Sequence, residues 1–198
     1  MSRLPAAKRK TQLLDTAATV FAGMGYHGTT TAELAKAAGV SEPIIYRHFK
    51  SKKGLFIELI ERTGQDTLGV WKKSLADLTD PAERLLKLLA SNPMVEAKAQ
   101  VRYRVIVQAM TETQDPDITV ALQSHIQRLH AFITQELLAA QQSGVAQAAF
   151  SAELVAWLLI HIALGYGTLT SLGVPGQGTD AAGRHIDEIV AGLVLKHS

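Results

Sequence analysis

The sequence predicts an all-α protein of about nine helices, with a three-helix head at the N-terminus and a helical bundle behind it. Apolar residues recur with helical spacing in almost every segment, and no stretch alternates as a half-buried strand does. Caps of Ser, Thr or Asp, early prolines and terminal glycines recur along the chain as helix start and stop signals. The 198 residues, 47% of them apolar, are enough to bury a substantial core.

The first helix is expected from about Ala6 to the glycines at Gly23 and Gly25. Its apolar stripe consists of Leu13, Leu14, Ala17, Ala18, Phe21 and Met24. These residues recur every three or four positions, which is typical of a helix with one buried face.

Two short helices are expected next, joined by a tight turn. Thr30 and Glu33 have the spacing of a capping box, and Gly39 is a typical residue to end a helix. Ser41 followed by Pro43 predicts the start of a helix of barely two turns. A pair of this kind is a helix-turn-helix, whose second helix enters the major groove of DNA.

The rest of the chain is expected to form the helical body. Its helices are predicted to begin near Ser51, Asp80, Glu96, Asp115 and Ser151, and a last helix that contains Ile186 is expected after the loop at 173–178. Two of these starts are Asp-Pro pairs with a further carboxylate in the first turn, where the helix dipole favours negative charge.

The second short helix has one face that a plain helical hairpin would not need. Ile45 and Phe49 are four residues apart and are expected to point into the core. The opposite face then carries Pro43, Ile44, Tyr46, Arg47 and His48. Hydroxyl groups and helix N-termini at Thr30 and Ser41 suit phosphate oxygens.

Positive charge is concentrated in the same region. Residues 1–62 hold 10 Lys and Arg against 5 Asp and Glu, whereas the other 136 residues hold 10 against 13. Lys50, Lys52 and Lys53 extend the basic surface beyond the second short helix. This asymmetry is the expected footprint of a nucleic-acid surface.

Residues 30–41 read Thr-Thr-x-x-Leu-Ala-Lys-Ala-Ala-Gly-Val-Ser, and residues 45–56 read Ile-Tyr-x-x-Phe-x-Ser-Lys-x-x-Leu-Phe. This pattern resembles the DNA-binding head of the tetracycline-repressor (TetR) family over about residues 8–60. The resemblance implies a homodimeric transcription factor, usually a repressor, whose last two long helices pair with those of the partner and whose effector domain buries a small molecule. It implies backbone contacts from Thr30, Ser41, Tyr46, His48 and Lys52, and base contacts from Pro43, Ile44 and Arg47.

Three positions depart from the family pattern. Ala32 stands where many members have an Arg that reaches DNA, Glu42 replaces a frequent Lys or Arg, and Ile44 replaces a frequent Thr. Fewer hydrogen-bonding groups then face the bases. We therefore expect Ile44 to contact a thymine methyl group and Arg47 to make much of the direct readout.

The body is expected to hold an effector pocket and a dimer interface. Tyr103, Met110, His125, Leu129, Trp157 and His161 are predicted to converge as a mostly apolar pocket with a few polar anchors. The helix from Ser151 to about Leu172 is apolar nearly all round, so it must be covered on two sides. A two-fold dimer covers it, and the alternative is a central helix in a larger bundle.

Other functions have little support in the sequence. The string Gly-Met-Gly-Tyr-His-Gly at 23–28 matches a dinucleotide fingerprint by letters alone, because no strand precedes it. There is no cysteine, and His125 and His130 would point about 140° apart on a helix. We expect no enzyme, no cofactor and no metal site. The longest apolar run, Leu154 to Leu164, is short of the ~20 residues that span a bilayer, so we expect no membrane segment.

The sequence thus predicts a cytoplasmic, ligand-responsive, dimeric DNA-binding regulator. Residues 1–50 are expected to be the helix-turn-helix domain, linked by the helix from about residue 51 to an effector-binding and dimerisation domain at 51–198. The expected action is that of a repressor released from a palindromic operator by a small, mostly apolar effector. The alternatives are a small-molecule carrier or enzyme with a vestigial head, and a nonspecific DNA-coating protein.

Overall fold

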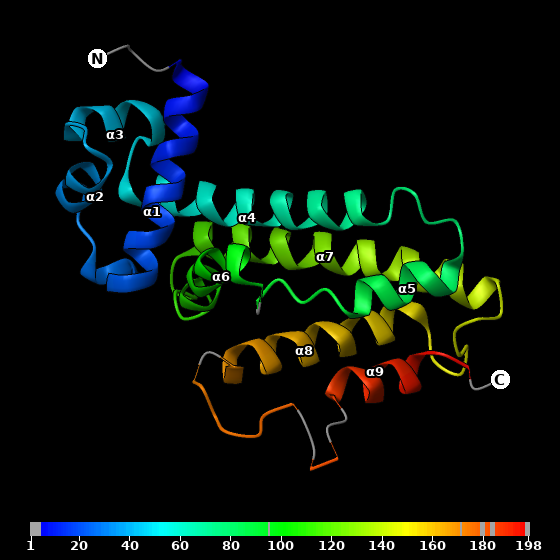
Figure 1. Cartoon of the computed structure of the whole chain (residues 1–198). Coiled ribbons are helices and arrows are strands. Elements are labelled where there is room, and N and C mark those ends of the chain that lie inside the picture. Colours follow the sequence, from blue (N-terminus) through cyan, green and yellow to red (C-terminus); the bar gives the residue numbers. More distant parts are fainter. Residues whose placement is uncertain (1–4, 95, 171, 179–180, 183–184, 197–198) are drawn as a thin grey trace. The chain divides into compact units, whose positions relative to one another are not determined.

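The computed structural model describes residues 5–94, 96–170, 172–178, 181–182 and 185–196. Within these ranges the fold is all-α, as predicted, and an isolated β bridge joins Ala146 to Leu195. The helices are α1 (Ala6–Gly28), α2 (Thr31–Ala38), α3 (Glu42–Phe49), α4 (Lys52–Ser74), α5 (Pro81–Leu89), α6 (Ala97–Ala109), α7 (Pro116–Gln142), α8 (Ala152–Thr170) and α9 (Ile186–Val194) (Figure 1).

The described chain divides into two compact units. The first comprises the residues up to 65 together with 100–125, and the second comprises 66–99 and 126 onward. Helices α4, α6 and α7 each contribute to both units. The first part of α4, most of α6 and the start of α7 are thus grouped with α1, α2 and α3. The predicted division into a DNA-binding domain at 1–50 and an effector-binding domain at 51–198 stays a prediction.

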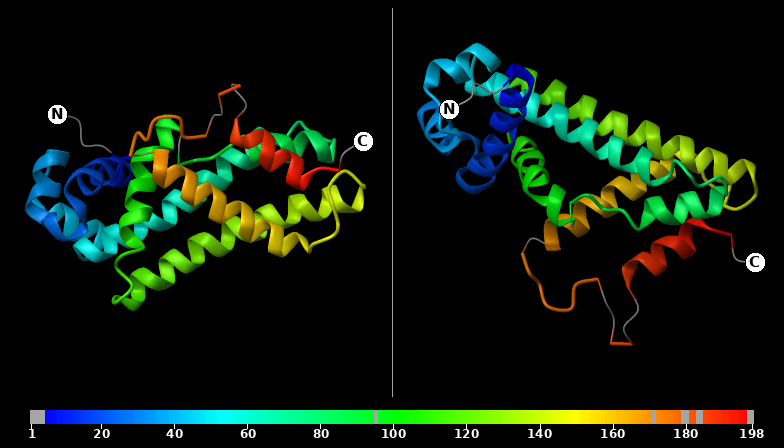
Figure 2. Two further views of the ribbon diagram at one scale, coloured as in Figure 1. Left: turned by 90° about the horizontal axis from the view of Figure 1, so that it is seen from below. Right: turned by 45° about the horizontal axis from the view of Figure 1, so that its top comes forward.

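The first unit is built around an aromatic cluster. Phe21 from α1 and Phe56 from α4 are fully buried, and their ring centroids lie 5.1 Å apart in an edge-on arrangement. The ring of Tyr26 lies 4.5 Å from that of Phe56. Both views in Figure 2 show α1, α2 and α3 grouped together, and α2 packs against both of its neighbours.

Helix α1 extends further than the sequence indicates. The glycines at 23 and 25 predict its end, but the helix continues to Gly28 across a kink at Gly25. Gly25 has φ 77° and ψ 164°, a backbone conformation that other residues rarely adopt. The kink brings the last turn of α1 toward α4, where Tyr26 meets Phe56.

The second unit has its own core. Its buried members come from α4, α5, α7, α8, α9 and the segment between α7 and α8, and include Trp71, Leu85, Leu129, Ile133, Ala156 and Val194. The Trp71 and Phe132 rings stack at 5.8 Å, and Trp71 Nε1 donates a hydrogen bond to Ser91 Oγ at 3.1 Å. Gly167 lies so close to Met94 that a Cβ there would be 2.3 Å from the Met94 Cβ.

Helix α8 presents an apolar stripe to solvent. Leu154, Trp157, Leu158 and Leu169 are exposed at helical spacing, while Ala156 and Ile160 face the core. In α9, Ile189 and Leu193 are also exposed. By length and composition the whole of α8 could cross a membrane. The uninterrupted apolar run within it is shorter, which is why the sequence alone predicts no membrane segment. Helices that pack within proteins meet the same criterion.

Candidate nucleic-acid interface

The turn between α2 and α3 is set by local hydrogen bonds. At the start of α2 the capping box is complete, because Thr30 Oγ1 accepts from the Glu33 amide and the Glu33 carboxylate accepts from the Thr30 amide. This backbone hydrogen bond lowers the pKa of Glu33. At its end Gly39 is left-handed, with φ 64°, and the Val40 amide bonds to the Ala35 carbonyl at 3.0 Å. That is the pattern by which glycine ends a helix.

Helix α3 has the two faces that the sequence predicts. Ile45 and Phe49 are buried. Pro43, Tyr46 and Arg47 are exposed, while Ile44 and His48 are half-buried. The Tyr46 hydroxyl lies 3.2 Å from Thr31 Oγ1 at the start of α2, so a polar contact between the two helices orients the exposed ring.

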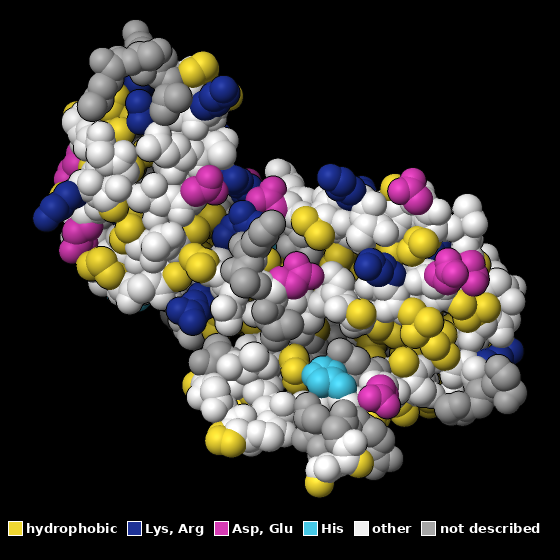
Figure 3. Space-filling model, in the orientation of Figure 1, with side chains coloured by type: hydrophobic (Ala, Val, Ile, Leu, Met, Phe, Trp, Pro, Cys, Tyr) yellow, Lys and Arg dark blue, Asp and Glu magenta, His cyan; other side chains and the backbone are white. Residues whose placement is uncertain are grey.

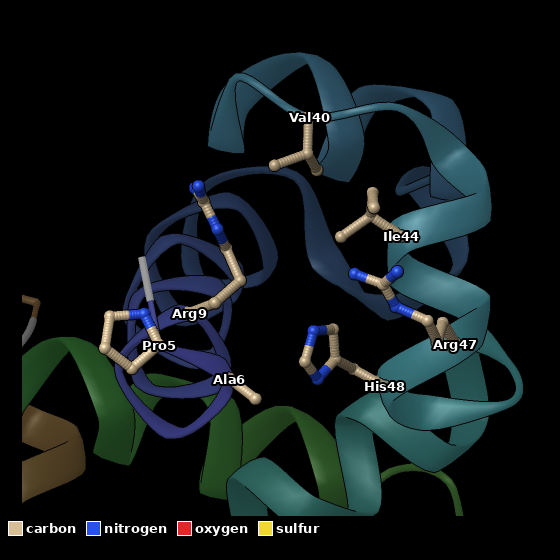
Figure 4. Close-up of a pocket in the computed structure, with 7 residues that line it drawn as sticks. All are labelled: Pro5, Ala6, Arg9, Val40, Ile44, Arg47 and His48. Atoms are coloured by element: carbon tan, nitrogen blue, oxygen red, sulfur yellow. The ribbon is translucent and has the colours of Figure 1, made fainter. Parts of the chain in front are cut away.

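A hollow of about 710 Å³ lies beside this face (Figure 4). It is lined by Pro5, Ala6, Arg9, Val40, Ile44, Arg47 and His48. In Figure 4 the side chains of Arg9 from α1 and of Arg47 and His48 from α3 extend toward the same space. Arg9 is not among the residues predicted to contact DNA. The available signal was the basic start of the first helix, where Lys8, Arg9 and Lys10 are consecutive.

His48 is held mainly uncharged in this setting. Its pKa is lowered from the ordinary value, first by partial burial and then by the positive charges of Arg47, Lys10 and Arg9, while Glu58 acts in the opposite direction. The hollow is therefore a concentration of positive charge that lacks a matching anion among the residues lining it. Lys and Arg side chains are also seen at the surface of the three-helix head in Figure 3.

The basic residues after α3 have different surroundings. Lys50 is exposed. Lys53 pairs with Asp117 at 2.6 Å and Asp115 at 3.2 Å, and the hydrogen bonds that its ammonium donates to these carboxylates raise the pKa of Lys53. Lys53 is one of the three lysines predicted to extend the DNA surface. Its positive charge is thus compensated by two aspartates of the protein.

Lys52 is half-buried, and its position explains how α1 and α2 are joined. Its ammonium donates hydrogen bonds of 2.9 Å to the carbonyls of both Tyr26 and Thr29, and it lies 4.5 Å from the centre of the Tyr26 ring. An ammonium group has three N–H donors. Two of them satisfy carbonyls at the end of α1, so the predicted phosphate contact of Lys52 would have to use the third.

The two hydroxyl groups predicted at the phosphates also differ. Thr30 Oγ1 is engaged in the capping box and donates to Glu33 Oε2 at 2.8 Å. Ser41 precedes α3 as expected, but its side chain makes no capping hydrogen bond with the described residues. The Ser41 side chain is exposed, which leaves its hydroxyl available to an external group.

The residues predicted for an effector pocket lie in different environments. Tyr103 and His125 are buried in the first unit, with ring centroids 5.9 Å apart, and Met110 is half-buried there. Leu129 belongs to the core of the second unit. Trp157 and His161 lie on the exposed stripe of α8, where the Trp157 ring stacks on His130 at 4.3 Å and on His161 at 6.2 Å. No metal-binding cluster of His, Asp and Glu occurs in the described part of the chain.

The capped α2, the left-handed Gly39 and the short α3 have the geometry of a helix-turn-helix. Residues 13–59 match the family model described as "Bacterial regulatory proteins, tetR family". This segment is therefore similar to the TetR family, in line with the resemblance seen in the sequence. The matched residues comprise most of α1, all of α2 and α3, and the first third of α4.

Two relatives are named transcriptional regulators and not enzymes. The activator FasR of Mycolicibacterium smegmatis is 38% identical over 84 residues, which are 42% of this chain and 38% of FasR. The repressor KstR2 of Rhodococcus jostii is 34% identical over 84 residues, covering 42% of this chain and 41% of KstR2. The match thus spans less than half of either relative.

The fold extends beyond the matched segment. A putative regulator from Saccharomonospora viridis, solved in complex with choline, superposes with a TM-score of 0.81 at 23% identity. The superposition covers 96% of this chain and 100% of that one. At this identity the likeness concerns the fold alone.

Proposed function

We propose that the protein is a cytoplasmic transcriptional regulator that binds a palindromic operator as a homodimer and is released from it by a small molecule. The observation that carries this proposal is the exposed face of α3, where Arg47 and His48 adjoin a hollow that also receives Arg9. A cationic face next to a short, solvent-exposed helix suits insertion into a major groove. The named relatives support it, and they include both an activator and a repressor. We propose that the protein acts as a repressor of transcription, which is the action expected from its sequence.

The proposed dimer is formed by α8 and α9. Their exposed apolar side chains include Leu154, Leu158, Ile189 and Leu193. Contiguous apolar surface of this kind is unfavourable in water and marks an interaction site. A two-fold pairing of the same stripe in two copies would cover it. A palindromic operator then requires the two recognition helices of the dimer to lie about 34–36 Å apart, one turn of DNA.

Coupling between effector and DNA is proposed to pass through α4. The Lys53 ammonium at the start of α4 pairs with Asp115 and Asp117 at the start of α7. Both helices continue into the second unit, which contains the predicted effector residue Leu129. A ligand that tilts either helix would therefore move α3. A coupling of ~1–3 kcal/mol changes operator affinity by roughly 5- to 150-fold.

The proposed function is tested by selecting bound sequences from a random DNA pool and counting subunits per site by sedimentation. We expect an enriched palindrome bound by two subunits, or by four if two dimers share one operator. Length-dependent binding without enrichment, lost at physiological salt, would instead indicate a nonspecific DNA-coating protein.

Arg47→Ala is expected to relax sequence preference at one base step at a cost of ~1–3 kcal/mol, because a bidentate contact to a base edge is lost. Lys50→Ala is the matched control, since Lys50 is an exposed cation outside the recognition face. It should weaken binding to all sequences alike and lower the salt slope. Binding titrations on the selected site and on single-base variants distinguish the two. Equal specificity profiles would contradict the assignment of Arg47.

His48 is expected to make operator binding stronger as the pH falls. In the free protein its pKa is lowered, so the imidazole is neutral at pH 7. Nearby phosphates favour the imidazolium, so binding takes up a proton and affinity rises at lower pH. For each unit by which DNA binding raises the pKa of His48, we expect operator affinity to increase by up to about tenfold between pH 8 and pH 6. His48→Gln should flatten the pH dependence, and an unchanged slope in this variant would exclude His48 as its source.

A further inference from the structure

One edge of the Arg128 guanidinium group, in α7, is buried. Its Nε and Nη2 atoms are shielded from solvent, and neither makes a hydrogen bond with any residue that the structure describes. The guanidinium of arginine stays charged in proteins, and burying a charge without a partner is unfavourable. Two buried N–H donors without a hydrogen bond would be stabilised by an acceptor.

Arg84 in the same unit shows what such a pair binds. Its Nε and Nη2 donate to the two carboxylate oxygens of Glu136 at 2.8 and 2.6 Å, and its Nη1 donates to the carbonyls of Leu75 and Leu78 at 2.8 and 2.9 Å. This is the bidentate geometry in which arginine matches a carboxylate. Arg128 presents the same two nitrogens, but no carboxylate of the described chain occupies them.

We infer that Arg128 is the anchor for the carboxylate of an anionic effector, bound through Nε and Nη2 as Glu136 is bound by Arg84. The inference rests on the proposed function and names the chemical class of its ligand. Leu129 follows Arg128 and Phe132 lies one turn further along α7, and both pack in the apolar core of the second unit. The ligand is therefore an organic acid with a largely apolar body. This agrees with the mostly apolar effector expected from the sequence and adds a carboxylate at one end.

The test compares the full-length wild type with Arg128→Met, a substitution that keeps much of the side-chain volume and removes the charge. Without ligand, we expect the variant to melt at the same temperature as the wild type or higher, because an uncompensated charge is removed. Arg84→Met is the matched control and should melt at a lower temperature, because it leaves the Glu136 carboxylate, whose side chain is 11% exposed, without its partner. A loss of stability in Arg128→Met equal to that in Arg84→Met would overturn the inference.

Ligand class is tested with acetate, decanoate and decanol at constant ionic strength. We expect the carboxylates to raise the melting temperature of the wild type, and Arg128→Met to bind decanoate about 10- to 100-fold more weakly. Decanol should affect both proteins equally. Equal responses of the two proteins to both carboxylates would exclude the site.

Operator binding, measured in parallel, separates this inference from the proposed function. Decanoate that binds through Arg128 but leaves operator affinity unchanged would support the anion site and contradict ligand-responsive regulation. If the protein binds its operator but wild type and Arg128→Met respond equally to both carboxylates, the result would contradict the anion site alone.

Discussion

Leu158→Glu is expected to convert the proposed dimer into a monomer and to weaken operator binding by about 10²- to 10⁴-fold, the avidity that two linked half-sites provide. Leu158 is 48% exposed on the apolar stripe of α8, so the substitution does not disturb the core of its own unit. In a two-fold interface each change is present twice, and a buried carboxylate without a partner is strongly unfavourable. Sedimentation analysis and operator titration at fixed salt measure both effects.

Val120→Glu is the control for this experiment. Val120 is 63% exposed on α7, outside the proposed interface, and the same substitution there should leave the subunit count and operator affinity unchanged. A dimer of normal affinity in Leu158→Glu would show that the stripe on α8 is covered by something other than a second copy.

Phe56→Ala is expected to lower the free energy of unfolding by ~3–5 kcal/mol and to abolish operator binding. The Phe56 side chain is fully buried between α1 and α4, with the rings of Phe21 and Tyr26 at 5.1 and 4.5 Å. Its removal leaves a cavity at the point where the recognition head is attached to α4. Urea unfolding measures the loss.

Met24→Ala provides the comparison within the same region. Met24 belongs to the predicted apolar stripe of the first helix, but the structure leaves it 48% exposed. The substitution should change the free energy of unfolding by no more than about 0.5 kcal/mol. A large loss would mean that Met24 is covered in the protein in solution.

The helix-turn-helix could be predicted almost completely because its signals are local. The capping box at Thr30, the left-handed Gly39 and the burial of Ile45 and Phe49 were all expected from spacing. Each depends on residues within four or five positions of one another, where helix geometry alone decides which groups meet. The same holds for the all-α fold.

Long-range partners could not be predicted in this way. The phosphate contact of Lys52 stays a prediction, but the hydrogen bonds from its ammonium to two carbonyls, 23 and 26 residues earlier in the chain, were not foreseen. Lys53 is paired with aspartates more than 60 residues later. Spacing along one helix contains no information on such partners, because they are set by how separate helices pack.

Helical periodicity and capping chemistry are properties of short segments, so the fold class, the two short helices and the residues on the exposed face of α3 follow from the sequence. The tertiary structure alone decided which charges remain available. It paired Lys53 with Asp117 and Arg84 with Glu136, brought Arg9 beside Arg47, and left the buried edge of Arg128 without a carboxylate among the described residues. The physical reason is that a charge acts through its surroundings, and only packing between distant segments creates those surroundings.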